Sequence, residues 1–193
     1  KDVDPDTDAL AGTSFGGRSE KKKYHVQGIE INPDGTKIFL VFNDVNGNGD
    51  GVKEYNLSTP YDIATMSLVT SGGIHLSKGE TGFNPNAIFI GLNGKRLFVT
   101  DHDKYTVTQF TLHNPYDTSS FTEDGSVSIQ DLTSDNNRQT RALGFSKSGL
   151  KMFVSDDEGD DEIFEFNLTC PFNIIAGKCP SITSDPDRAG IAE

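Results

Sequence analysis

The stretch GIEINPDGTKIFLVFNDVNGNGDGVKEYNLSTPYDI, which runs from Gly28 to Ile63, decides the fold because the chain repeats it twice. The second copy is AIFIGLNGKRLFVTDHDKYTVTQFTLHNPYDT at 87–118, and the third is ALGFSKSGLKMFVSDDEGDDEIFEFNLTCPFNI at 142–174. Self-similarity at a fixed period is the signature of repeat architectures. The chain is therefore expected to fold as consecutive copies of one supersecondary unit.

Proline and glycine positions put the three copies in register. Pro60, Pro115 and Pro171 are spaced 55 and 56 residues apart. The distance from Pro60 to Gly94 is 34 residues, and the distance from Pro115 to Gly149 is again 34. The first copy is longer only inside the loop NGNGDG, and an insertion in a hairpin loop is what a true repeat tolerates.

Each copy contains the same predicted pieces: a short strand, a glycine-bearing turn, an apolar strand and an alternating strand. The short strands are 28–31, 87–90 and 142–145, and the turns are NPDG, GLNG and SKSG. The apolar runs IFLVF, LFV and MFV are typical of strands covered on both faces, whereas the strands after them alternate with a period of two. The turns TPYD, NPYD and CPFN end these strands, and weaker fourth strands follow in MSLV and SVSIQDL.

Four antiparallel strands repeated about every 55 residues predict an all-β, β-propeller-like fold, and helical periodicity is missing throughout. A β-sandwich of seven or more strands is the alternative, which the strict repetition of aromatic, leucine and proline positions disfavours. We expect blades at 28–86, 87–141 and 142–174, the third of them incomplete. Residues 1–27 are expected to form an N-terminal strand or linker, and residues 175–193 a C-terminal tail.

The composition excludes two classes of partner. The chain has 193 residues and a formal net charge of −12, so it offers no basic face to nucleic acid. No run of 18 apolar residues is present, so no membrane-spanning helix is predicted. With 34% hydrophobic residues, 20 glycines and no tryptophan, many short strands and turns are favoured over long helices.

The repeated pattern (F/I)-x-x-(D/N/S)-G-x-K-(hydrophobic)-F-V, then (aromatic)-x-L-x-x-P-(Y/F)-(D/N), resembles β-propeller repeats of the broad YVTN/lactonase-like kind. It looks most like the SPDG-type arrays of bacterial and phage surface proteins, and it covers residues 28–174. The resemblance implies a propeller fold but no particular function, because this architecture hosts many unrelated activities. Lactonase-like propellers hold a metal through acidic and His ligands facing the central channel, and no such set can be assigned residue by residue here.

Three blades fall short of the four to eight that close a propeller, so the sheet margins need cover. Residues 5–15 resemble a fourth strand without its own blade, and the third blade lacks that strand. One hypothesis is that this strand completes the third blade of another copy by strand addition, which gives a homo-oligomer or a filament. The other hypothesis is that the chain is cut from a longer protein that carries the remaining blades.

A candidate calcium site lies in the first hairpin loop. Asn46, Asn48, Asp50 and Glu54 place oxygen donors at loop positions 1, 3, 5 and 9, with glycine at position 6 and Val52 at position 7. Calcium takes six to eight oxygen ligands, and glycine permits the sharp turn that such a loop requires. The spacing resembles the calcium hairpins of integrin-type propellers, although only Asp50 and Glu54 carry charge. The alternative is a Gly/Asn-rich hairpin turn without an ion.

Cysteines and glycosylation sequons point to an extracellular or cell- or virion-surface location. Cys170 and Cys179 lie nine residues apart and would close a small loop in an oxidising compartment. Asn56 and Asn167 begin N-glycosylation sequons at the same position of two repeats. We therefore expect a disulfide between the two cysteines and a glycoprotein.

Catalysis has little support in the sequence. His25, His75, His102 and His113 occupy four different repeat positions, and no G-x-S-x-G motif is present. A base with an orienting partner could be formed at 101–103, but an ordinary hairpin loop explains this run as well. The sequence therefore favours a non-catalytic structural module that assembles with copies of itself in a surface array or filament. The alternatives are a glycan- or protein-binding propeller and a lactonase-like, metal-dependent hydrolase.

Overall fold

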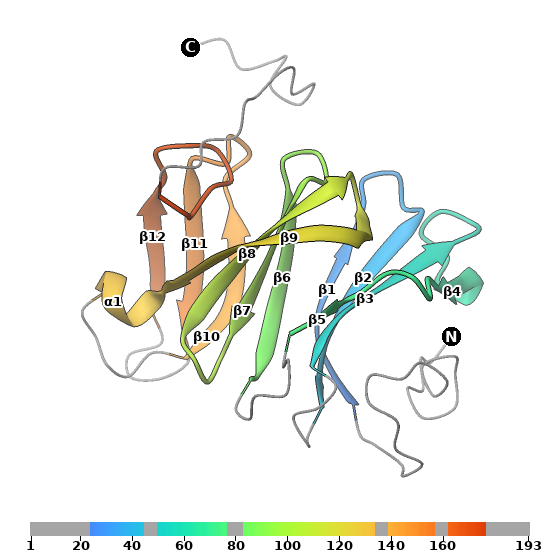
Figure 1. The fold of residues 1–193 in the computed structure, drawn as a ribbon, viewed down its shortest axis with the longest axis horizontal. Coiled ribbons are helices and arrows are strands. Elements are labelled where there is room, and N and C mark those ends of the chain that lie inside the picture. The colour runs from blue at the N-terminus through green and yellow to red at the C-terminus, as the bar shows by residue number, and fades with distance from the viewer. Residues whose placement is uncertain (1–23, 45–49, 77–82, 134–138, 157–161, 177–193) are drawn as a thin grey trace.

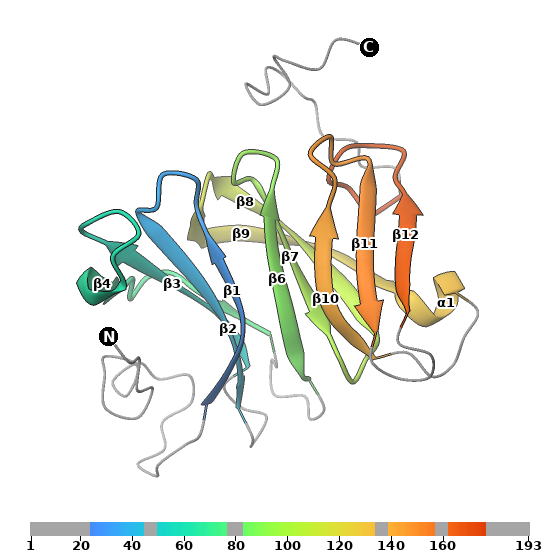
Figure 2. The ribbon, with the colours of Figure 1, turned by 180° about the vertical axis from the view of Figure 1, so that it is seen from behind.

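The computed structural model describes residues 24–44, 50–76, 83–133, 139–156 and 162–176. Within them the chain forms three antiparallel sheets, and the strands of each sheet lie side by side in sequence order apart from one short addition. The sheet that follows second in the sequence lies between the other two in both views (Figures 1 and 2). The predicted β-propeller-like arrangement of repeated antiparallel blades is confirmed.

The first sheet contains the strands β1 (Tyr24–Ile31), β2 (Lys37–Asp44), β3 (Gly51–Leu57) and β4 (Met66–Leu68). A short 3-10 helix, η2 (Ile63–Thr65), precedes β4, and the two-residue strand β5 (Ile74–His75) also pairs with β3. β1 begins four residues before the expected start at Gly28. It can do so because a bulge between Val26 and Gly28 lets the strand continue along β2.

The second sheet contains β6 (Pro85–Gly91), β7 (Arg96–Asp101), β8 (Thr106–Asn114) and β9 (Asp117–Ser128). The fourth strand starts directly after the NPYD turn, earlier than expected, and it ends at Ser128. The expected strand SVSIQDL is therefore only half correct, because the short helix α1 (Ile129–Thr133) follows. Ser128 accepts a hydrogen bond from the backbone N–H of Asp131 at 3.2 Å, and Ile129 is fully buried, so the chain turns inward there.

The third sheet contains β10 (Thr140–Phe145), β11 (Lys151–Asp156) and β12 (Ile163–Asn167). Among the described residues it has three strands, and the incompleteness of the third blade stays a prediction. Residues 5–15, the proposed donor strand, lie outside the described residues.

A repeated turn fastens one end of each blade. Tyr61, Tyr116 and Phe172 adopt positive φ angles of 60°, 54° and 50°. Each donates its backbone N–H, at 2.8–2.9 Å, to the carbonyl of the glycine in the turn between the first two strands of its blade. The turns TPYD, NPYD and CPFN are thus clasps that hold the third strand against the hairpin of the first two.

Apolar side chains pack between neighbouring sheets. One buried cluster joins the first and second sheets, with Phe39, Val41 and Val52 on one side and Ile90 and Leu97 on the other. A second buried cluster joins the second and third sheets and includes Phe98, Val107, Met152, Val154 and Phe172. The strands β2 and β7 are covered on both faces, as their continuous apolar runs predict. The alternation of β3 and β8 predicts one buried face, but both faces of these strands are buried over most of their length.

Candidate functional site

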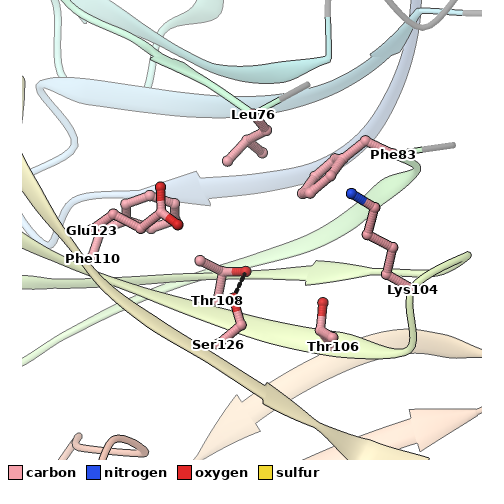
Figure 3. Close-up of a pocket in the computed structure, with 8 residues that line it drawn as sticks. All are labelled: Leu76, Phe83, Lys104, Thr106, Thr108, Phe110, Glu123 and Ser126. Carbon is pink, nitrogen blue, oxygen red and sulfur yellow. Dashed lines mark hydrogen bonds between the residues drawn. The ribbon is translucent and has the colours of Figure 1, made fainter. Parts of the chain in front are cut away.

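A cavity of about 240 Å³ opens between the first and second sheets (Figure 3). Its lining combines a cation, a carboxylate, hydroxyls and apolar groups: Leu76, Phe83, Lys104, Thr106, Thr108, Phe110, Glu123 and Ser126. Ligand sites are typically concave and apolar with a few polar groups that fix orientation, and a cavity below the roughly 300–1,000 Å³ of drug-sized pockets suits a smaller molecule.

The polar wall of the cavity consists of side chains that alternate along the strands β8 and β9. Thr106, Thr108 and Phe110 are two residues apart on β8, so their side chains share one face of the sheet. β9 runs antiparallel beside β8, with Phe110 opposite Glu123 and Thr108 opposite Ser126. The hydroxyls of Thr108 and Ser126 are hydrogen-bonded at 2.8 Å, which Figure 3 draws as a dashed line. Two adjacent strands therefore supply the hydroxyls and the carboxylate.

Lys104 reaches the cavity from the hairpin between β7 and β8. Its ammonium lies 5.1 Å from the centroid of the Phe83 ring, in a cation–π arrangement. Figure 3 shows the Lys104 ammonium and the Glu123 carboxylate at two different sides of the cavity. A ligand in between would meet a positive group at one end and a negative group at the other.

The base of this hairpin is fixed by Asp101, which is fully buried. Its Oδ1 accepts backbone N–H groups of Asn84 at 3.2 Å, Asp103 at 3.0 Å and Lys104 at 3.1 Å. Burial raises the pKa of the Asp101 carboxyl, and these backbone hydrogen bonds oppose the rise. Asp101 thus ties the hairpin that carries Lys104 to the residue before β6.

The residues 101–103, considered as a base with an orienter, do come together with Asn84. His102 Nδ1 lies 2.7 Å from Asp103 Oδ1, and the Asn84 amide donates to the same oxygen at 3.2 Å. The amide of Asn43 in the first sheet donates in turn to Asn84. His102 Nε2 is shielded from solvent, so the ring is placed to brace the hairpin rather than to meet a ligand.

The structure separates the charged members of the predicted calcium loop. Asn46 and Asn48 lie outside the described residues. Asp50 is fully buried, and Val52 belongs to the apolar cluster between the first two sheets. Four residues of extended strand place Glu54 roughly 13 Å from Asp50. The carboxylate of Glu54 accepts hydrogen bonds from Lys37 and from Thr118 of the second blade. The calcium site stays a prediction. Across the described ranges, no group of three or more His, Cys, Asp or Glu side chains gathers as a metal site.

The disulfide and glycosylation predictions fall on both described and undescribed residues. Cys170 is buried and disulfide-bonded, whereas Cys179 lies outside the described residues. Asn56 on β3 and Asn167 on β12 are both exposed, so each amide is accessible. No helix in the described part of the chain is both long enough and apolar enough to cross a membrane.

Sequence reasoning missed Lys104, Glu123 and the hydroxyls of the cavity. These residues do not recur at one position of the repeat. They come from the hairpin between β7 and β8 and from the strands β8 and β9. The alternation of Thr106, Thr108 and Phe110 is a signal that could have placed them on one face, but nothing in the sequence indicated that this face is left open.

No protein-family model and no curated protein sequence matches the chain. Solved structures share its fold. A periplasmic gluconolactonase of Pseudomonas aeruginosa has a TM-score of 0.58 at 15% identity, over 75% of this chain and 37% of that chain. A Bacteroides fragilis protein proposed to be a 6-phosphogluconolactonase has a TM-score of 0.55 at 16% identity, over 80% of this chain and 41% of that chain. A similarly described protein of Bacteroides uniformis has a TM-score of 0.52 at 14% identity, over 75% of this chain and 37% of that chain.

The class of protein defined here is a β-propeller with the fold of lactonase-like proteins. At these identities the similarity establishes the fold, and the chain spans about two fifths of the length of the structures that it matches. The expectation of a non-catalytic structural or filament-forming module is wrong, because the three solved structures named above are described as lactonases. The sequence offered little support for a lactonase because its histidines do not recur at one repeat position, whereas the cavity is built from residues that do not repeat.

Proposed function

We propose that this chain contributes blades and a substrate site to a lactonase-like hydrolase that opens a small polyhydroxylated lactone. The observation that carries the proposal is the cavity in Figure 3, which offers Glu123 and Lys104 to the same ligand. The threonine and serine hydroxyls suit the hydroxyl groups of a sugar-derived ring. The faces of Phe83 and Phe110 suit its apolar carbon atoms.

The chemistry needs a base and a positive group. Glu123 accepts a proton from a water molecule while the oxygen of that water attacks the carbonyl carbon of the lactone. Lys104 stabilises the negative charge that develops on the carbonyl oxygen. The ring C–O bond then breaks, the proton returns from Glu123 to the departing alkoxide, and the product is a hydroxy acid whose carboxylate faces Lys104.

Lactone hydrolysis releases acid, so a pH-stat assay with D-glucono-1,5-lactone tests the proposal against the spontaneous rate. Loss of a general base typically costs 10²–10⁴-fold, so Glu123→Gln should lower kcat/KM by at least about 100-fold. Lys104→Met should lower kcat more than it raises KM, because the cation acts on charge that develops in the transition state. Glu162→Gln and Lys95→Met, exposed residues outside the cavity, are the matched controls. A wild-type rate equal to the spontaneous rate, or full activity of both cavity variants, would refute the proposal.

A second candidate is sugar binding without hydrolysis, which the aromatic and hydroxyl lining of the cavity also supports. In that case calorimetry would show binding of gluconate or glucose that Phe83→Ala abolishes. The pH-stat would meanwhile register only the spontaneous reaction of the lactone.

A location outside the cytoplasm is supported by the disulfide-bonded Cys170, by the exposed sequon residues Asn56 and Asn167, and by the periplasmic relative. Membership of the surface-array group of propellers stays a prediction. Calcium binding by the loop at 46–54 is a separate proposal: calorimetric titration should give heat with millimolar calcium, and Asp50→Asn should abolish it. The absence of both heat and a thermal shift would end that proposal.

A further inference from the structure

The contact between neighbouring blades is built in the same way twice. Oε2 of Glu54 in the first blade accepts the backbone N–H and the hydroxyl of Thr118 in the second blade, each at 2.8 Å. Gln109 takes the same place in the second blade, where its Oε1 accepts the backbone N–H of Ile174 at 2.8 Å. The side chain of Gln109 also donates to Asn173 at 3.1 Å. Each time, a buried side-chain oxygen on the third strand receives the N–H that follows the proline–aromatic–Asx turn of the next blade.

The face that receives the next blade consists of the same three repeat positions. In the first blade these are Phe39, Val52 and Glu54, and in the second blade Phe98, Val107 and Gln109. All six side chains are 0–1% exposed, because a neighbouring blade covers them. Burial of this kind is a consequence of the contact, since the same positions need not be buried when no blade follows.

Within the described part of the chain, no blade packs against the same face of the third blade. Its equivalents are Phe153, Ile163 and Glu165, which we call the docking face. Ile163 is 74% exposed, the side chain of Glu165 is 45% exposed, and Phe153 is only half-buried. An exposed isoleucine next to an exposed carboxylate acceptor, at positions that are otherwise sealed, marks a surface that fits a blade of the same design.

The first blade presents the matching half. Tyr61 and Ile63 belong to the turn that corresponds to Tyr116–Thr118 and Phe172–Ile174, and we call residues 61–63 the docking turn. Tyr61 is 62% exposed and Ile63 is 41% exposed, whereas Thr118 is 1% exposed. One chain therefore carries both an uncovered receptor at its third blade and an uncovered turn at its first.

A lysine forms an ion pair with the glutamate of the docking face, as it does in the first blade. In the first blade, Lys37 donates to Oε1 of Glu54 at 2.5 Å and to the carbonyl of Tyr116 in the next blade at 2.8 Å. Its equivalent Lys151 donates to Oε1 of Glu165, also at 2.5 Å. The ion pair thus has the same form before and after docking, and Oε2 of Glu165 corresponds to the oxygen of Glu54 that binds Thr118.

We propose that the docking face of one copy of this chain binds the docking turn of a second copy, with Glu165 accepting the backbone N–H of Ile63 and Lys151 donating to the carbonyl of Tyr61. The contact is face to face between blades, so it needs no exchanged strand. Two such contacts, each joining the third blade of one copy to the first blade of the other, close a ring of six blades.

Light scattering on the 193-residue chain tests the proposal. The expected mass is twice the 21.0 kDa of one chain, and Ile163→Asp combined with Glu165→Lys should reduce it to 21.0 kDa. Lys147→Glu, in the exposed turn of the same blade outside the docking face, should leave the dimer intact. Circular dichroism and thermal unfolding of each variant show whether a loss of dimer reflects misfolding.

Cross-linking gives an independent readout. Ile63→Cys mixed with Ile163→Cys should give a disulfide-linked dimer under oxidation, whereas each variant alone should give much less. A monomer at every concentration overturns the proposal and leaves further blades of a longer polypeptide as the occupant. A dimer that the Ile163 and Glu165 substitutions do not weaken, or in which 63 and 163 do not cross-link, overturns it equally.

Discussion

The ring of Tyr116 lies directly over Gly94. The backbone N–H of Tyr116 donates to the Gly94 carbonyl at 2.9 Å, and the glycine has a φ of +83°. A Cβ built on Gly94 would overlap the tyrosine ring. The same pairing recurs between Gly35 and Tyr61, and between Gly149 and Phe172, so glycine is required by both backbone conformation and space.

Gly94→Ala should therefore destabilise the protein by roughly 2 kcal/mol or more, because it adds a left-handed alanine and an overlap with the ring. Urea unfolding at equilibrium measures this cost. Gly144→Ala is the control, since a Cβ there meets nothing within 4 Å and its stability should change little. Equal stability of the two variants would show that the clasp does not constrain the turn.

Thr118→Val should weaken the contact between the first two blades. The hydroxyl of Thr118 donates to Glu54 and accepts from the backbone N–H of Gly73, both at 2.8 Å, and valine removes it without changing the shape. We expect a loss of about 1–3 kcal/mol because buried polar groups lose their partner. Thr122→Val, on the exposed side of the same strand, should stay within about 0.5 kcal/mol. A neutral Thr118→Val would mean that packing alone holds these blades together.

The pH dependence of stability should carry the signature of Glu30. Burial raises the pKa of this carboxyl to about 7 in the folded protein, above the 4.5 of an exposed glutamate. The unfolded chain therefore loses its proton first as the pH rises. The contribution of Glu30 should make the protein less stable between about pH 4.5 and 7 and then level off.

Unfolding free energies of the wild type and Glu30→Gln across that range isolate this contribution. Their difference should grow in favour of the variant as the pH rises to about 7. Asp34→Asn is the control: hydrogen bonds from Thr36 lower the pKa of Asp34, so its contribution has the opposite sign and lies at lower pH. A constant difference between wild type and Glu30→Gln would contradict the prediction.

Asp101 should be needed for its oxygen rather than for its charge. Asp101→Ala leaves three backbone N–H groups without their acceptor, so we expect a loss of about 2–3 kcal/mol together with displacement of Lys104 from the cavity. Asp101→Asn keeps an acceptor and removes a buried charge, so it should cost far less at pH 7. Urea unfolding separates the two variants. Equal destabilisation by both would show instead that the carboxylate charge holds the hairpin.

The alternation and spacing of the repeat predicted much of the fold because they depend on local chemistry. Apolar runs such as IFLVF fixed which strands are central, and the proline–aromatic turns fixed where the third strands end. The helix at Ile129–Thr133 was missed because its formation depends on burying Ile129 against the second blade, and five residues carry too weak a periodic signal.

The candidate site could not be predicted in the same way. Leu76, Phe83, Lys104 and Glu123 become neighbours only because a linker, a hairpin and two strands meet at the junction of two blades. Glu54 was predicted from the sequence as a calcium ligand. In the structure, packing of the second blade makes its carboxylate the acceptor of two hydrogen bonds from Thr118.

By itself, the sequence determined the repeat, the antiparallel strands and the turns that end the third strands, since each follows from side-chain alternation and backbone preferences within about 35 residues. The tertiary structure alone decided which face of each blade is sealed, which carboxylate is buried and where a cavity stays open. Those outcomes depend on which residues from distant segments exclude water together, a property that no single repeat contains.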